Sequence, residues 1–270
     1  MKNKRLLIIL IIFAFLTLIV VLSSTIFTVS KIEVVWTTVR NVLDSEDDED
    51  IIESAQFKMG ESIFFVDKEK YINNLEKENP YLLVYGIEIM FPNKLVVYAA
   101  ERVPVYALKV TDSSQPAEYN LILMDKTLKV LEIAAPSVLT DSATLNVLEI
   151  QNIPLSDLDF EVGTIASQLV ADNILPNFIN AMESAGYSKI QLKAFVNKLI
   201  LESCTRYEFT IYTNWGITII IDDASKKFTE KIFFALSVFE YCHDAPVPIT
   251  SGTINVFETE NGIIEGGHNY

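Results

Sequence analysis

The residue pair in this chain that most suggests catalysis is His243 with the adjacent Asp244. A carboxylate beside an imidazole can orient the ring as a general base. The pair also ends a helical pattern and precedes Pro246, and a cation at a helix C-terminus is stabilised by the negative end of the helix dipole. We favour this structural interpretation over a catalytic one.

Short motifs typical of hydrolases and transferases are absent from the sequence. It contains no Ser-x-x-Lys motif of penicillin-binding transpeptidases, and no Gly-x-Ser-x-Gly, His-Glu-x-x-His or phosphate-binding loop. Carboxylate pairs for glycoside cleavage could be chosen in many ways among 36 acidic residues, so they indicate no particular site. We therefore expect no catalytic residues and no enzymatic activity.

Residue types that bind metals are few or poorly arranged. Six of the seven residues from Asp44 to Asp50 are acidic, but a calcium loop needs a glycine for its sharp turn that this segment lacks. The apolar residues that follow favour a solvated helix start, where carboxylates suit the helix dipole. Cys204, Cys242 and two histidines cannot build a metal framework, and we expect buried thiols, with a disulfide as the alternative. We expect neither metal nor cofactor.

The amino terminus carries an apolar run that is long enough to cross a membrane. Three basic residues precede this run, which covers residues 6–22 and includes Leu6, Leu10, Phe15, Val20 and Leu22. A cleaved signal peptide is the alternative, but its apolar region has about 7–15 residues and ends at a small-x-small site. We expect an uncleaved anchor within residues 1–30, with the amino terminus in the cytoplasm and residues 31–270 outside.

The charge of the chain limits its partners. The formal net charge is −15, and every acidic residue follows residue 31. Such a surface repels nucleic acid and anionic lipid headgroups. We expect protein partners and contact with membrane lipid through the anchor alone, with no nucleic acid and no small-molecule substrate.

The segment after the anchor predicts a small α+β module. Alternation from Lys31 to Trp36 indicates a strand, and the helix after the acidic cluster could end in a left-handed cap at Gly60. Asp67 can cap a second helix, which stops before Pro80. Two β-branched and aromatic runs, Tyr81 to Phe91 and Leu95 to Ala100, then predict a hairpin around the turn Pro92-Asn93.

This order and its landmarks resemble the POTRA domain of the FtsQ/DivIB family of bacterial cell-division proteins. The landmarks are Gly60, Ile63-Phe64, Val66-Asp67, the turn Pro92-Asn93-Lys94-Leu95, and the exit Glu101-Arg102-Val103-Pro104-Val105-Tyr106. The family usually has a Gly-Asn-like turn after the first strand, where this chain has Trp36-Thr37-Thr38. The POTRA-like domain is placed at residues 31–104. We expect Glu101, Arg102 and Pro104 to form its junction with the next domain.

Residues 105–257 predict a second, mixed and mainly antiparallel β domain with covering helices, followed by a polar tail over residues 258–270. Helices are expected around Ile165 to Val170, at Phe178 to Met182, where Gly186 closes the helix, and over the stripe Phe228 to Phe239, capped by Asp223. The expected strands are Tyr119 to Met124, Leu128 to Ile133, Leu145 to Ile150, Ile190 to Phe195, Lys198 to Glu202, Tyr207 to Thr213, Ile217 to Ile221 and Thr250 to Phe257. The fold class is thus α+β with one transmembrane helix.

The resemblance implies a non-enzymatic scaffold of the division septum. Such a scaffold binds small bitopic division proteins of the FtsB/DivIC and FtsL type and helps to control septal peptidoglycan synthesis. In the family, the closing part of the second domain is where the FtsB-type partner docks. The last predicted strand would therefore carry the site, with Thr253, Ile254, Asn255, Val256 and Phe257 at an open sheet edge that accepts a partner strand.

Three alternatives remain at this point. The last predicted strand could be internal and fully paired within its sheet. The chain could instead be a membrane-anchored cell-wall hydrolase or esterase with unrecognised catalytic residues. A POTRA module of an outer-membrane transport system is the third alternative, but such systems carry several tandem repeats, and one repeat is visible here.

Overall fold

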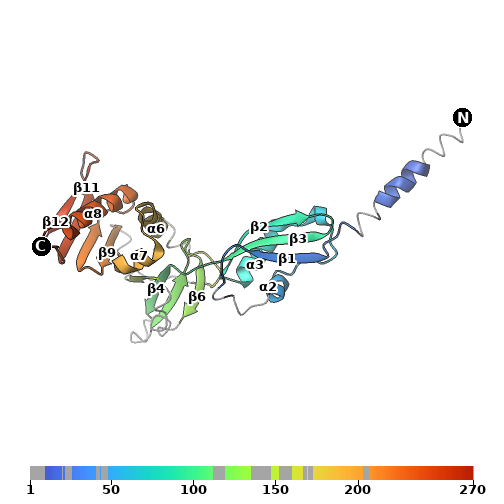
Figure 1. Cartoon of the computed structure of the whole chain (residues 1–270), viewed down its shortest axis with the longest axis horizontal. Coiled ribbons are helices and arrows are strands. Elements are labelled where there is room, and N and C mark those ends of the chain that lie inside the picture. The colour runs from blue at the N-terminus through green and yellow to red at the C-terminus, as the bar shows by residue number, and fades with distance from the viewer. Residues whose placement is uncertain are drawn as a thin grey trace. The chain divides into compact units, whose positions relative to one another are not determined.

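The computed structural model describes residues 10–19, 21, 26–40, 43, 48–111, 119–134, 147–151, 160–166, 169, 173–202 and 207–269. The chain divides into two compact units, Met1–Arg102 and Val103–Tyr270, which we call unit 1 and unit 2 (Figure 1). The sequence placed the corresponding boundary at residue 104. Each unit is described by itself below.

Residues 10–19 form a helix with exposed apolar side chains, among them Leu10 and Phe15. Within the described part of the chain, no helix is both long and apolar enough to cross a membrane. The other predicted anchor residues, Leu6, Val20 and Leu22, lie outside the described residues. The anchor therefore stays a prediction.

Unit 1 folds as a three-stranded sheet with helices packed against it (Figure 1). Its elements are β1 (Lys31–Trp36), α2 (Asp48–Ser54), η2 (Ile63–Phe65), α3 (Lys68–Glu78), β2 (Leu82–Met90) and β3 (Lys94–Glu101). The strand order is β1-β3-β2, with β1 parallel and β2 antiparallel to β3. Ile51 of α2 and Leu75 of α3 pack with Leu95 of β3 in one hydrophobic core.

Local signals in unit 1 explain its helix boundaries. Asp67 caps α3 as predicted, since its side chain accepts a hydrogen bond from the backbone N–H of Lys70. The prediction for Gly60 was wrong, because α2 already ends at Ser54 and Gln56 takes a positive φ of 55°. Gly60 lies farther along the loop at φ 84°, and its N–H donates to the carbonyl of Val29 before β1. It shapes a loop rather than a helix end.

Unit 2 contains one nine-stranded sheet, in the order β12-β11-β10-β9-β8-β7-β4-β5-β6. The pairs β10–β11, β7–β8 and β4–β7 are parallel, and the other five pairs are antiparallel. The strands are β4 (Tyr106–Thr111), β5 (Tyr119–Met124), β6 (Val130–Ala134), β7 (Leu148–Gln151), β8 (Val196–Glu202), β9 (Glu208–Thr213), β10 (Ile217–Ile221), β11 (Gly252–Glu258) and β12 (Ile264–Asn269).

The helices of unit 2 with described bounds are α6 (Ile174–Ser184), α7 (Lys189–Phe195) and α8 (Phe228–His243). The core between helices and sheet is aromatic at its centre. Phe209 of β9 lies 5.3 Å, between ring centroids, from both Phe178 of α6 and Phe228 of α8. The amphipathic stripe of α8 is thus core, as the sequence indicated. Gly186 ends α6 at φ 90°, also as predicted.

Two predictions for unit 2, both about where a helix begins, were wrong. Residues 190–195 were expected to form a strand but belong to α7, because Ser188 and Gln191 form a reciprocal capping box that starts a helix. Asp223 was expected to cap α8, which instead begins after Lys227. Asp223 adopts φ 45° in the preceding turn, where its carboxylate accepts hydrogen bonds from Ser225 Oγ and Lys226 Nζ.

The end of the chain folds differently from the prediction. The strand predicted as last and at an edge corresponds to β11, which pairs with β10 on one side and with β12 on the other. The expected polar tail over residues 258–270 contains β12, an edge strand of the sheet as described. A turn over residues 259–263, which includes Asn261-Gly262, reverses the chain between the two strands.

Candidate partner-binding site

β12 is one of the two edge strands of the unit 2 sheet, the other being β6. β12 pairs antiparallel with β11 in a register that runs from Glu258 opposite Ile264 to Thr253 opposite Asn269. Among the described residues, no strand pairs with its other side. A strand with one partner presents a row of unpaired backbone N–H and C=O groups, and another chain can pair with such an edge.

The beginning of β12 is fixed to helix α8. Thr259 and Ile263 close the preceding turn, with the N–H of Thr259 2.8 Å from the Ile263 carbonyl oxygen. Lys227, before the first turn of α8, places its Nζ 2.8 Å from Oε1 of Glu258 and also donates to the Gly262 carbonyl. The Lys227 hydrogen bond lowers the pKa of the Glu258 carboxyl. The ion pair therefore holds the turn that precedes the edge strand.

The end of β12 is fixed as well. Nε2 of His268 lies 2.7 Å from the Ser251 carbonyl oxygen, next to the start of β11. With contacts at both ends, β12 is held in an extended conformation before any partner arrives. Such preorganisation reduces the entropy that binding must otherwise cost.

Two adjacent glycines in β12 have different surroundings. A methyl group at Gly266 would collide with the Asn255 carbonyl oxygen and lie 3.1 Å from the Val256 Cα, whereas one at Gly267 would meet nothing within 4 Å. Gly266 is thus required by the close approach of β11. Gly267 leaves open space beside the backbone.

A cavity of about 410 Å³ lies along β12. Phe234 of α8, Phe257 of β11 and Ile264 of β12 contribute apolar surface to its lining, and Glu265 contributes a charge. Successive side chains of β11 point to opposite faces, so Val256 is buried while Phe257 is 41% exposed. An edge strand beside a partly apolar cavity can take both the backbone and the side chains of an added strand.

The predicted docking residues thus lie one strand too far inward. Ile254 and Val256 are buried in the core, and Thr253, Asn255 and Phe257 pair with β12. Sequence reasoning missed β12 because its run Ile-Glu-Gly-Gly-His-Asn has low strand propensity. The signal that could have found it is Asn261-Gly262, a typical hairpin turn.

Comparisons with known proteins match this chain to cell-division proteins. A family model described as the POTRA domain, FtsQ-type, matches residues 38–102, which end where unit 1 ends. The chain is also similar to the cell division protein DivIB of Clostridium acetobutylicum, with 23% identity over 145 residues. Both matches support the FtsQ/DivIB family for this chain, and the family model itself covers the POTRA domain alone. The aligned region covers 54% of this chain and 51% of the DivIB relative, about half the length of that relative.

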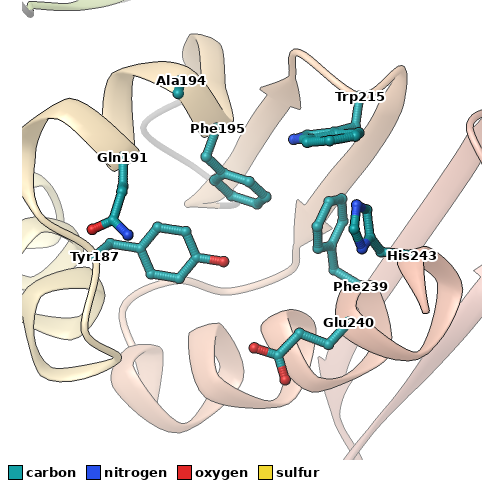
Figure 2. Close-up of a pocket in the computed structure, with 8 residues that line it drawn as sticks. All are labelled: Tyr187, Gln191, Ala194, Phe195, Trp215, Phe239, Glu240 and His243. Atoms are coloured by element: carbon teal, nitrogen blue, oxygen red, sulfur yellow. The ribbon is translucent and has the colours of Figure 1, made fainter.

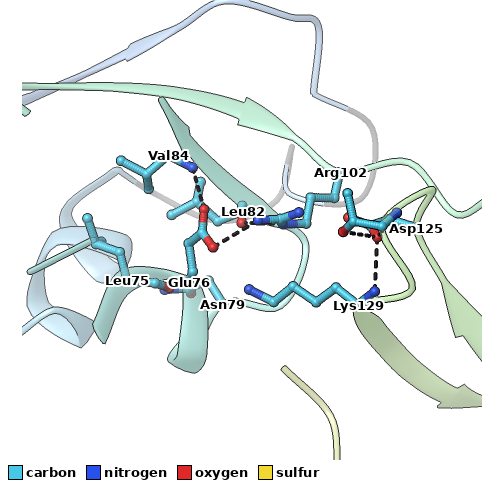
Figure 3. Close-up of polar contacts among 9 residues, drawn as sticks. Leu75, Glu76, Asn79, Leu82, Val84, Arg102, Asp125 and Lys129 are labelled. Atoms are coloured by element: carbon cyan, nitrogen blue, oxygen red, sulfur yellow. Dashed lines mark hydrogen bonds and ion pairs between the residues drawn. The ribbon is translucent and has the colours of Figure 1, made fainter. Parts of the chain in front are cut away.

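The predicted turn at Pro92-Asn93 and the start of the predicted exit, Glu101 and Arg102, lie in unit 1. Pro92 and Asn93 occupy the turn between β2 and β3, and the Asn93 carbonyl accepts the N–H of Ser30 at 2.9 Å. Glu101 is the last residue of β3. Figure 3 shows Arg102 beside Glu76, with 2.8 Å between Nη2 and Oε2, while Arg102 Nε donates to the Leu82 carbonyl. This ion pair fixes the exit of the POTRA domain to its second helix.

Pro104, the third predicted junction residue, belongs to unit 2. Its carbonyl oxygen accepts a hydrogen bond of 2.7 Å from Nζ of Lys189, the first residue of α7. Burial lowers the pKa of Lys189 to about 8. The start of unit 2 is thus tied to α7 by one partly buried ammonium group.

The residues considered above for chemistry pack against, or pair with, other side chains of unit 2 or lie outside the described residues. His243 ends α8, packs its ring 4.7 Å from Trp215 and 6.1 Å from Phe239, and lies 3.1 Å from the Asp244 carboxylate. Cys242 is a buried free thiol whose pKa is raised by burial, and Cys204 lies outside the described residues.

The acidic cluster opens α2 with Asp48, Glu49 and Asp50, while residues 44–47 lie outside the described part. Acidic residues in a first helical turn suit the helix dipole. Among the described residues, no cluster of histidine, cysteine or acidic side chains is arranged to hold a metal.

Proposed function

We propose that this chain is a non-enzymatic scaffold of the division machinery, and that β12 docks a strand from a small bitopic division protein. The partner would be of the FtsB/DivIC or FtsL type, and docking would help to control septal peptidoglycan synthesis. The observation that carries the proposal is the open edge of β12, whose two ends are fixed by Lys227 and His268.

Strand addition suits this edge better than a helix-binding mode would. Main-chain hydrogen bonds to β12 provide affinity, and the cavity beside Phe257 and Ile264 accepts alternate side chains of the added strand. The FtsQ-type POTRA match and the similarity to a DivIB protein support a role in division. Neither of them names the partner of this chain.

The proposed topology places the working part of the protein outside the cytoplasm. A single anchor within residues 1–30 would hold the amino terminus inside, with residues 31–270 outside at the septum. Mass analysis of the protein extracted from membranes tests this topology. Loss of about the first two dozen residues would mean a cleaved signal peptide and no anchor.

Localisation in dividing cells separates this proposal from a role as a cell-wall hydrolase or esterase. A fluorescent protein fused to the amino terminus should give a band at midcell. Uniform membrane fluorescence would contradict the division proposal. Affinity capture from crosslinked membranes should then recover a small single-pass division protein, and recovery of none would contradict the scaffold role.

A further inference from the structure

A second cavity of unit 2, of about 300 Å³, lies where α7 and α8 end (Figure 2). Its lining comes from the segment after α6, from α7, from the turn between β9 and β10, and from the last turn of α8. The lining residues are Tyr187, Gln191, Ala194, Phe195, Trp215, Phe239, Glu240 and His243. β12 contributes no residue to this lining.

Aromatic rings form most of the wall of this cavity. Phe195 lies 4.9 Å from Phe239 and 5.4 Å from Tyr187, measured between ring centroids. Trp215 stands against the ring of His243 and is 48% exposed. The faces of such rings carry negative electrostatic potential and attract cations, most strongly at tryptophan.

Two polar groups at the cavity have no hydrogen-bond or ion-pair partner among the described residues. The Glu240 carboxylate makes no hydrogen bond or ion pair there, and neither does the Tyr187 hydroxyl, which points into the space between the rings in Figure 2. Burial raises the pKa of Tyr187, and the Glu240 charge raises it further. The last turn of α8 adds the negative end of its helix dipole.

We propose that this cavity binds the guanidinium group of an arginine carried by a partner protein. The carboxylate, the ring faces and the helix end all favour a cation over a neutral side chain. A planar guanidinium stacks on aromatic rings and has donors for both the Glu240 carboxylate and the Tyr187 oxygen. The exposed apolar residues Ile190 and Tyr241, each next to a lining residue in sequence, indicate a protein-sized partner.

This site goes beyond the proposed docking at β12 and does not depend on it. It can be tested on the purified full-length chain in detergent, because the chain contains just two tryptophans. With 5-fluorotryptophan in place of tryptophan, fluorine NMR gives one resonance for Trp215 and one for Trp36, and single replacements by phenylalanine assign them. Trp36 belongs to unit 1 and serves as the internal reference.

The probe is N-acetyl-arginine amide, titrated at about pH 8, where an imidazole is ordinarily uncharged. The expected result is a saturable shift of the Trp215 resonance with none at Trp36. The citrulline analogue has nearly the same shape without charge and should give no shift. An equal response to citrulline, or no response to arginine, would overturn the proposal, and tighter binding of the lysine analogue would overturn the choice of guanidinium.

A matched pair of variants tests the carboxylate. Glu240→Gln should weaken binding of the arginine probe by roughly three- to fivefold, as expected when a partly exposed ion pair is lost. Glu230→Gln, in the first turn of the same helix, should leave binding unchanged. Equal affinities for all three proteins would mean that Glu240 does not recognise the cation.

Discussion

The Nζ atom of Lys227 lies 2.8 Å from the Glu258 carboxylate and thereby joins the beginning of α8 to the end of β11. The same ammonium group donates to the Gly262 carbonyl in the turn before β12. β12 has one strand neighbour in the described structure, whereas an internal strand has two. The position of β12 therefore depends more strongly on contacts at its ends.

Lys227→Met should loosen the turn and the start of β12. Backbone amides of Ile264 and its neighbours are expected to exchange hydrogen several-fold faster, because the turn loses both its ion pair and its hydrogen bond. Hydrogen exchange followed by mass spectrometry measures the change. Lys226→Met is the matched control, since this adjacent lysine pairs with Asp223 and not with the turn. Similar exchange in both variants would contradict the anchoring role of Lys227.

The two glycines of β12 should respond differently to alanine. Gly266→Ala forces a methyl group against the Asn255 carbonyl and should lower the free energy of opening at β11 and β12 by about 1–3 kcal/mol. Gly267→Ala enters open space and should stay within about 0.5 kcal/mol of the parent. Hydrogen exchange of the two strands tests both variants. Equal effects would mean that β11 does not approach Gly266 as closely as described.

The ion pair between Arg102 and Glu76 should matter for the stability of unit 1. Glu76 is 20% exposed and also accepts the N–H of Val84, so Glu76→Gln removes a negatively charged partner of the buried guanidinium. We expect a loss of about 3 kcal/mol in the free energy of unfolding. Urea unfolding is followed by Trp36 fluorescence in a Trp215→Phe background.

Glu33→Gln is the control for that experiment. Glu33 pairs with Lys94 at the exposed surface of the same sheet, and little change is expected because solvent screens such pairs. A Glu76→Gln protein as stable as the Glu33→Gln protein would contradict a structural role for the Arg102 pair.

Lys189 should give unit 2 a distinct pH dependence. Its pKa is lowered to about 8 by burial, so between about pH 8 and the ordinary lysine value of ~10.4 the unfolded state binds more protons than the folded state. Stability contributed by this group therefore rises with pH across that window and is lost as pH falls through about 8.

The difference in free energy of unfolding between the parent and Lys189→Met isolates this effect. It should increase from pH 8 to pH 10 and stay flat below pH 7, with Trp215 fluorescence as the probe in a Trp36→Phe background. A difference that is flat throughout would mean that the pKa of Lys189 is the same in the folded and the unfolded state.

The sequence predicted elements well where a local signal and tertiary packing agree. In unit 1, Asp67 caps α3, and the turn at Pro92-Asn93 separates two strands with strong β propensity. The alternating apolar residues from Ile190 to Phe195 suggested a strand, but the capping box at Ser188 makes them a helix. Periodicity over six residues was too short to decide between the two.

The candidate sites were harder to predict because they depend on tertiary placement. β12 is glycine-rich, and its pairing with β11 gives it structure that its own propensity does not. The arginine-binding cavity unites Tyr187, Trp215 and Glu240, which come from three separate segments of the chain. No spacing in the sequence places these three side chains together.

Photocrosslinking in dividing cells tests the central claim most directly. A photoreactive benzoylphenylalanine replaces Gly267 of β12, where a side chain meets nothing within 4 Å, or Ile133 of β6, which is 46% exposed at the opposite edge of the same sheet. After irradiation, mass spectrometry identifies the adducts. We predict a small single-pass division protein crosslinked at Gly267 and not at Ile133. The absence of that adduct at Gly267, or equal crosslinking at both edges, would contradict docking on β12.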